Sequence, residues 1–111
     1  MAIVNQQLTT TQLDIVTVPS GVDGWAITNI LVCNTGNADA NFDLHLIPSG
    51  DALADKVTKV VSDLTLPSKE TFTFDSERIV LAPGDKIAFV AGPDIGAGLT
   101  DLAATVSYLE V

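Results

Sequence analysis

The sequence is poor in cysteine and in basic residues, and each shortage excludes a class of protein. Cys33 is the only cysteine among 111 residues, so neither an intrachain disulfide nor a cysteine-based metal site can form within one chain. Lys and Arg total 5 against 14 Asp and Glu, for a net charge of -9. Because nucleic acids and anionic membranes attract clustered basic side chains, we expect neither a nucleic acid nor a membrane as partner.

Long hydrophobic runs are also missing. Thr28, Asn29 and Asn34 interrupt the best candidate for a membrane helix, which needs about 18 apolar residues. The first residues lack the basic and apolar regions of a signal peptide, so we expect a soluble chain without a targeting segment. Hydrophobic residues nevertheless make up 47% of the chain and charged residues 17%, a composition that favours a folded protein over a disordered one.

Turn-forming residues divide the chain into short segments that are rich in β-branched and aromatic residues, as is typical of a sandwich or barrel. We expect an all-β fold with about eight strands and no substantial helix: one antiparallel β-sandwich at 13–111, either a jelly roll or an immunoglobulin-like Greek key. Residues 1–12 are expected to form an extended N-terminal arm. The expected strands are Leu13–Val18, Trp25–Cys33, Asn41–Ile47, Val57–Leu66, Thr71–Asp75, Arg78–Leu81, Lys86–Ala91 and Leu102–Leu109.

Alternation of apolar and polar residues supports the strand assignment. Phe42, Leu44 and Leu46 are expected on one face of a strand, with Asp43 and His45 on the other.

The Pro83-Gly84 pair fits the two central positions of a type II turn, where proline presets φ and glycine supplies a positive φ. The turn predicts a hairpin between Ile79–Leu81 and Ile87–Val90.

Three segments depart from this alternation because they are apolar on both faces: Trp25–Cys33, Ile79–Ala82 and Ile87–Ala91. The outer face of a sandwich sheet normally meets water, so something has to cover these strands. Loops or the arm fit this requirement as well as another subunit does, and the low charge favours assembly. In the first segment, strict alternation puts Ile27, Leu31 and Cys33 on one face and Ala26, Ile30 and Val32 on the other.

Candidate catalytic residues are few. His45 is the only histidine, and Asp43 on the same expected face could orient its ring as in a catalytic triad. A single histidine on the polar face of a strand is more often solvated or packed, and no Gly-x-Ser-x-Gly motif accompanies it. Cys33 lies in an apolar run and is interpreted as a small core residue rather than a nucleophile. We therefore expect no catalytic residue.

The acidic residues suggest a calcium site or a pair of catalytic carboxylates, but their spacing supports neither. They are scattered over expected loops, without an Asp-x-Asp-x-Asp-Gly motif, and are interpreted as solvated turn residues. We expect no metal and no cofactor. The loop acids considered are Asp23, Asp39, Asp51, Asp55 and Asp94.

Two further features resemble binding sites only superficially. Gly92–Gly98 is glycine-rich but lacks the residues of a phosphate-binding loop, so we interpret it as a flexible connection. Together with the arm at Met1–Thr11 it is a candidate contact region. Trp25 and Tyr108 are too few to form the aromatic platforms of a typical glycan-binding module.

Six segments of strand and turn residues follow one another in an order that is typical of a known group of proteins: Ile15–Gly21, Ala26–Gly36, Phe42–Gly50, Leu53–Lys56, Leu81–Ile87 and Ala103–Ser107. The most specific part is the order of VPSG, NILVCNTG and PGDKI. This order resembles the small β-sandwich virion proteins of tailed bacteriophages, and the similarity covers nearly the whole chain after residue 8.

The resemblance implies a structural protein of the phage particle, made in the host cytoplasm, without catalysis or cofactor. Within this group, a single small domain with an N-terminal arm and strands that are apolar on both faces favours a capsid decoration, or cement, protein that binds the major capsid protein as a homo-oligomer, a trimer by expectation. One alternative is a tail, neck or fibre-attachment component. A more distant alternative, from a different class, is a small lytic or carbohydrate-active domain built around His45 and Asp43.

Overall fold

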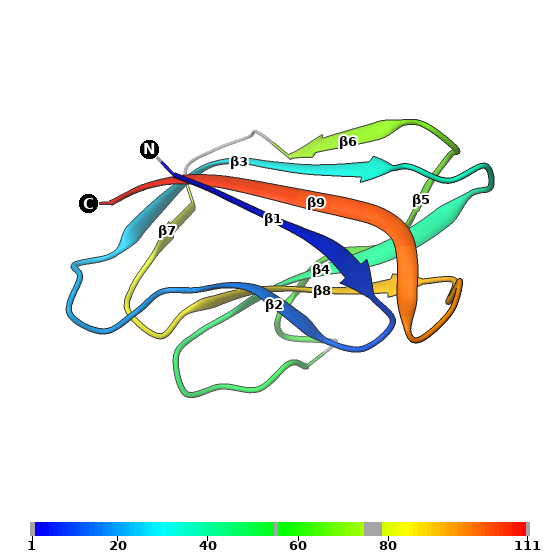
Figure 1. Cartoon of the computed structure of the whole chain (residues 1–111). Helices are drawn as coiled ribbons and strands as arrows, with labels where there is room; N and C mark the ends of the chain where they lie inside the picture. The colour runs from blue at the N-terminus through cyan, green and yellow to red at the C-terminus, as the bar shows by residue number, and fades with distance from the viewer. Residues whose placement is uncertain (1, 55, 75–78, 111) are drawn as a thin grey trace.

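The computed structural model describes residues 2–54, 56–74 and 79–110 and is all-β (Figure 1). Within these residues the chain forms nine strands and no helix, and the strands make two antiparallel sheets that pack face to face. The strands are β1 (Ala2–Thr9), β2 (Leu13–Thr17), β3 (Trp25–Asn34), β4 (Ala40–Ile47), β5 (Lys59–Leu66), β6 (Thr71–Phe74), β7 (Ile79–Leu81), β8 (Lys86–Gly92) and β9 (Leu99–Glu110).

The strand order identifies the type of sandwich. Sheet A has the order β1-β9-β3-β6, with β7 also paired to β3, and sheet B has the order β2-β8-β4-β5. Because β6 and β7 pair with different stretches of β3, they occupy one edge position together. The chain crosses between the sheets at every connection except β4–β5 and β6–β7, which is the order of a jelly roll.

The segments expected as strands correspond to β2 through β9, and the expected ends at Asp75 and Arg78 lie outside the described residues. Large apolar side chains from both sheets fill the space between them. In the core, the ring centroids of Phe42 and Phe89 lie 5.9 Å apart. Alternation holds in β6, where Phe72 and Phe74 pack against the core and the threonines are exposed.

Most of the expected arm is strand β1. Ala2–Thr9 pairs antiparallel with β9, Leu8 is fully buried, and Val4 packs against the core. The sequence masks this strand because Asn5-Gln6-Gln7 interrupts its apolar alternation, leaving few apolar residues to bury.

The expected hairpin between β7 and β8 is wrong, although its turn is present. Asp85 donates its N–H to the carbonyl of Ala82 (3.0 Å), and Gly84 has a φ of 89°. The turn nevertheless carries the chain from sheet A to sheet B, since β7 pairs with β3 and β8 with β2 and β4. The N–H of Gly84 and the carbonyl of Asp85 bond to Val18 instead of extending a ladder between β7 and β8.

The strict alternation that we expected for β3 is wrong, because a β-bulge changes which face its side chains occupy. Ile27 pairs with Tyr108 and Asn29 with Ser107, so Thr28 is an extra residue. An extra residue inverts the alternation on one side of it. As a result Ile27, Ile30 and Val32 are all buried in the core, while Ala26, Leu31 and Cys33 lie on the outer face.

Candidate interaction surface

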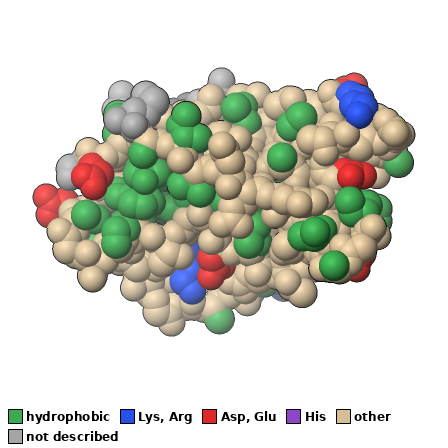
Figure 2. All heavy atoms as spheres, in the orientation of Figure 1, with side chains coloured by type: hydrophobic (Ala, Val, Ile, Leu, Met, Phe, Trp, Pro, Cys, Tyr) green, Lys and Arg blue, Asp and Glu red, His purple; other side chains and the backbone are tan. Residues whose placement is uncertain are grey.

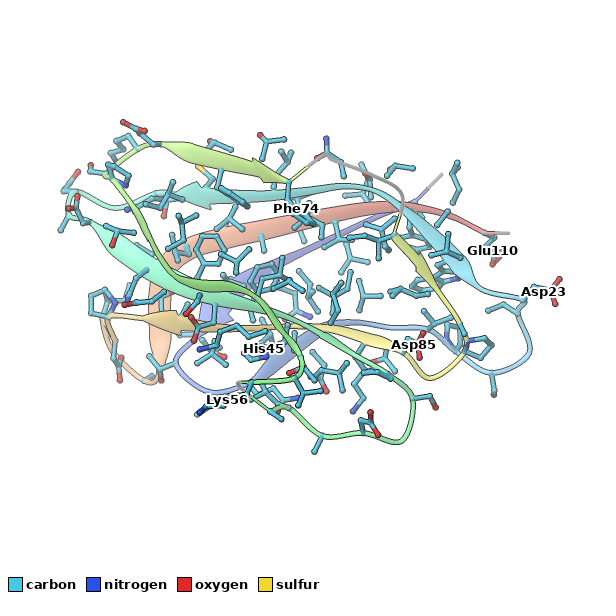
Figure 3. The ribbon with its side chains drawn as sticks, turned by 180° about the vertical axis from the view of Figure 1, so that it is seen from behind. Asp23, His45, Lys56, Phe74, Asp85 and Glu110 are labelled. Atoms are coloured by element: carbon cyan, nitrogen blue, oxygen red, sulfur yellow. The ribbon has the colours of Figure 1, made fainter. Side chains whose placement is uncertain are left out.

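The outer face of sheet B is partly covered by the chain itself. His45 and Ala88 pair across β4 and β8, which places them side by side on this face, and both are fully buried. The segment between β4 and β5 returns over them, held where Leu46 donates its N–H to the carbonyl of Thr58 (2.9 Å). Figure 3 shows His45 on the side of the sheet that faces this segment, near Lys56.

His45 is part of the hydrogen bonds that close this covering segment. Its Nδ1 lies 2.8 Å from Oγ1 of Thr58. The same hydroxyl donates to the carbonyl of Ala54 and accepts from its N–H, both at 3.0 Å. Because the imidazole is fully buried, solvent does not reach it, and the described contacts give it a role in positioning the segment.

Asp43 has other partners. One carboxylate oxygen lies 3.4 Å from Nζ of Lys59, and the other accepts the backbone N–H of Asp63. The described contacts therefore direct the expected pair, Asp43 and His45, toward different neighbours rather than toward one reaction centre.

The loop acids are surface residues. Asp23, Asp39, Asp51 and Asp94 are exposed, and Asp55 lies outside the described residues. In residues 2–54, 56–74 and 79–110, no group of three or more His, Cys, Asp or Glu side chains is placed to hold a metal ion.

The Gly92–Gly98 loop is organised by hydrogen bonds. The Asp94 carboxylate accepts the N–H groups of Gly96 (2.7 Å) and Gly98 (3.2 Å). Across the loop, Ile95 donates its N–H to the carbonyl of Leu99, and Leu99 donates its N–H to the carbonyl of Gly96. Thr10 donates its N–H to the carbonyl of Gly98. The loop thus joins the start of β9 to the turn that follows β1.

Trp25 and Tyr108 pack on each other. Their rings are stacked with centroids 3.9 Å apart, and both pack against the core. A surface hollow of about 360 Å³ lies beside Tyr108, between Ala2, Leu109 and Glu110. Because each ring covers a face of the other, the pair is not an open aromatic platform of the kind that stacks on sugars.

Among the described residues, no segment covers the outer face of sheet A, and most of the side chains on it carry no charge. Ile3, Val80 and Leu109 on this face are 63%, 61% and 41% exposed. Asp101 lies at one end of the face, beside Gly36. Neighbouring strands place four uncharged rows across it: Ile3 with Ser107 and Asn29; Asn5 with Thr105, Leu31 and Thr73; Gln7 with Ala103, Cys33 and Thr71; and Leu109 with Ala26 and Val80.

We call these four rows the neutral face. Cys33 lies on it, partly exposed, and not in the core as expected. The bulge at Thr28 and the missed strand β1 concealed this surface from sequence reasoning. The available signal was the uncharged polar residues at every second position, such as Thr71 and Thr73 or Thr105 and Ser107. Seen with β1 in front, the middle of the molecule is hydrophobic or uncharged, and charged side chains lie toward its ends and lower part (Figure 2).

Comparisons with protein-family models, curated proteins and solved structures found no match. In the part of the chain that the structure describes, no helix is long and apolar enough to cross a membrane. The virion assignment therefore stays a prediction from the sequence pattern.

Proposed function

We propose that this chain is a structural protein of a phage particle that decorates the capsid shell, and that it binds the shell through the neutral face. The neutral face is the observation that carries the proposal. The resemblance of the strand and turn segments to small phage virion proteins supports it. The jelly-roll order is consistent with it, since viral capsid domains use this fold, although lectins use it too and a fold by itself does not assign a function.

The neutral face suits repeated binding to a large protein surface. The chain carries a net charge of -9, which opposes non-specific association, yet these rows contribute no charge to that total. Exposed aliphatic side chains such as Ile3 and Val80 gain free energy when a partner removes them from water. Many copies bound to one shell would add modest contacts into a large total stabilisation.

Antibody-gold labelling of phage particles, taken from a lysate that contains this protein, tests the location by electron microscopy. We expect label over the whole head. Label confined to the tail or neck would replace decoration with the tail-component alternative, and particles without label would overturn the virion proposal.

Binding to purified shells that lack the protein tests whether the neutral face is the surface that contacts the shell. Thr105 lies in the middle of the neutral face, so T105K is expected to abolish co-sedimentation with shells and the gain in their heat resistance. V60K is the matched control, because Val60 is an exposed position on β5 of sheet B. Wild-type protein that neither binds nor stabilises shells would contradict the proposed function. Binding by T105K equal to that of the wild type would show that the neutral face is not the binding surface.

A further inference from the structure

Strand β1 ends sheet A with one side unpaired. Among the described strands its single neighbour is β9, so no described strand lies beside the outward N–H and C=O groups of Ala2–Thr9. Such a row of groups is a template for pairing with another strand. Sheet edges in soluble proteins are usually protected by charged side chains, prolines, bulges or short length. β1 spans 8 residues and contains neither a charged residue nor a proline, and its one register shift against β9 lies at its end, between Gln7 and Thr9.

The other edges are shorter than β1 or carry charged side chains, which β1 lacks. Strand β5 has two charged residues, two register shifts against β4, and a positive φ at Asp63. On the opposite edge of sheet A, β6 and β7 have only 4 and 3 residues. Strand β2 has 5 residues, a register shift, and Asp14 in an ion pair with Lys86. Among the described strands, β1 is thus the edge that is built for continuation.

We infer that β1 pairs antiparallel with β1 of a second copy, so that the two A sheets become one continuous sheet across a two-fold axis at the middle of the strand. In this register Asn5 lies opposite the same residue of the second copy, and Val4 lies opposite Gln6. The inference does not rest on the virion proposal, because it concerns backbone pairing at an edge and not the neutral face.

The charge distribution favours a second copy as the occupant. Two chains of charge -9 repel each other wherever acidic surfaces meet, and β1 lets them approach without placing any like charges opposite each other. A basic strand from another protein would find no acidic side chain on β1 to attract it.

Symmetry then determines the assembly number. An edge that pairs with itself is isologous and closes as a dimer. A trimer built through sheet edges would need β1 to pair with a different edge, and the other edges are short or charged. The pairing therefore replaces the expected trimer with a dimer as the basic unit.

Sedimentation velocity of the purified chain, between about 1 µM and 1 mM, tests the pairing. We expect a reversible dimer, and N5K is expected to raise its dissociation constant about tenfold or more because two lysines then lie opposite each other. T105K adds the same charge one strand further from the axis and should leave the dimer intact. A chain that is monomeric throughout, or a dimer that N5K leaves unchanged, would overturn the inference.

Cysteine cross-linking tests the register in a second way. In a C33S background, N5C should form a disulfide-linked dimer under mild oxidation, since directly opposed residues have Cα atoms about 5 Å apart. T105C should not, because two such residues lie about 15 Å apart, one further strand on each side. Both sites are on the sheet surface, so the fold is expected to persist, and circular dichroism checks it. Equal cross-linking of the two variants, or none at all, would overturn the proposed pairing.

Discussion

The outer faces of the two sheets differ in what lies on them. On sheet B, the segment between β4 and β5 returns over His45 and Ala88, and both are removed from water. On sheet A, Leu31, Cys33 and Ala103 at comparable central positions remain partly exposed. A strand that is apolar on both faces thus has one of two explanations in the same molecule. In β8 the chain covers itself, and in β3 the surface is left open.

The largest predicted effect on stability comes from comparing two variants, one with a lysine on the outer face of sheet B and one with a lysine on the outer face of sheet A. Ala88→Lys forces a long charged side chain into the fully buried position beside His45 on sheet B, and its desolvation and overpacking are expected to cost about 3–5 kcal/mol of unfolding free energy. Ala103→Lys puts the same side chain on the neutral face, where its end reaches water, at a cost below about 1 kcal/mol. Urea denaturation followed by Trp25 fluorescence measures both. A similar loss of unfolding free energy in the two variants would show that the outer face of sheet B is no more covered than that of sheet A.

A smaller effect is expected from the hydroxyl that closes the covering segment. Thr58→Val keeps the shape of the side chain but removes the group that bonds to His45 and Ala54, at an expected cost of about 1–3 kcal/mol. Amide hydrogen exchange should become faster in residues 48–54 and stay unchanged in sheet A. Thr73→Val, on the neutral face, is the control and should change stability by no more than about 0.5 kcal/mol. Equal changes in stability for Thr58→Val and Thr73→Val would mean that the covering segment is not held in place by the Thr58 hydroxyl.

The smallest effect is predicted for an ion pair at the rim of sheet B. Lys86 and Asp14 lie 3.5 Å apart, and each side chain is 34% exposed. Exposed pairs contribute little, so Lys86→Met should change the free energy of unfolding by less than about 1 kcal/mol, as measured by urea denaturation in low and high salt. The prediction would fail if Lys86→Met lowered the free energy of unfolding by much more than this and high salt lowered that of the wild type equally. Charge, and not the covering segment, would then stabilise this side of the sandwich.

Local patterns were sufficient for most strands and for one turn. Phe42 and Leu44 alternate with polar residues, and Pro83-Gly84 has the turn conformation expected from its two residue types. These features depend on neighbours in the sequence. Strand β1 was missed because its pairing with β9 joins residues about a hundred positions apart, such as Val4 and Val106, and its own alternation is weak.

The candidate surfaces were less accessible to sequence reasoning. His45 was expected on a polar strand face, and the strand is there, but the segment above it buries the ring. Cys33 was expected in the core, and the single extra residue Thr28 moved it to the outer face. A bulge forms through its partner strand, so residue types within β3 do not reveal it.

The sequence by itself determined the all-β class, the positions of β2 through β9 and the acidic character, because strand propensity, turn chemistry and charge are local properties. The tertiary structure decided which sheet each strand joins, which face each side chain occupies, and which edge and face stay open. Those outcomes arise from pairing between distant segments and from the competition between the two sheets for the same apolar side chains. The turn at Pro83-Gly84 illustrates the division, since its local geometry was predictable and the sheets that it connects were not.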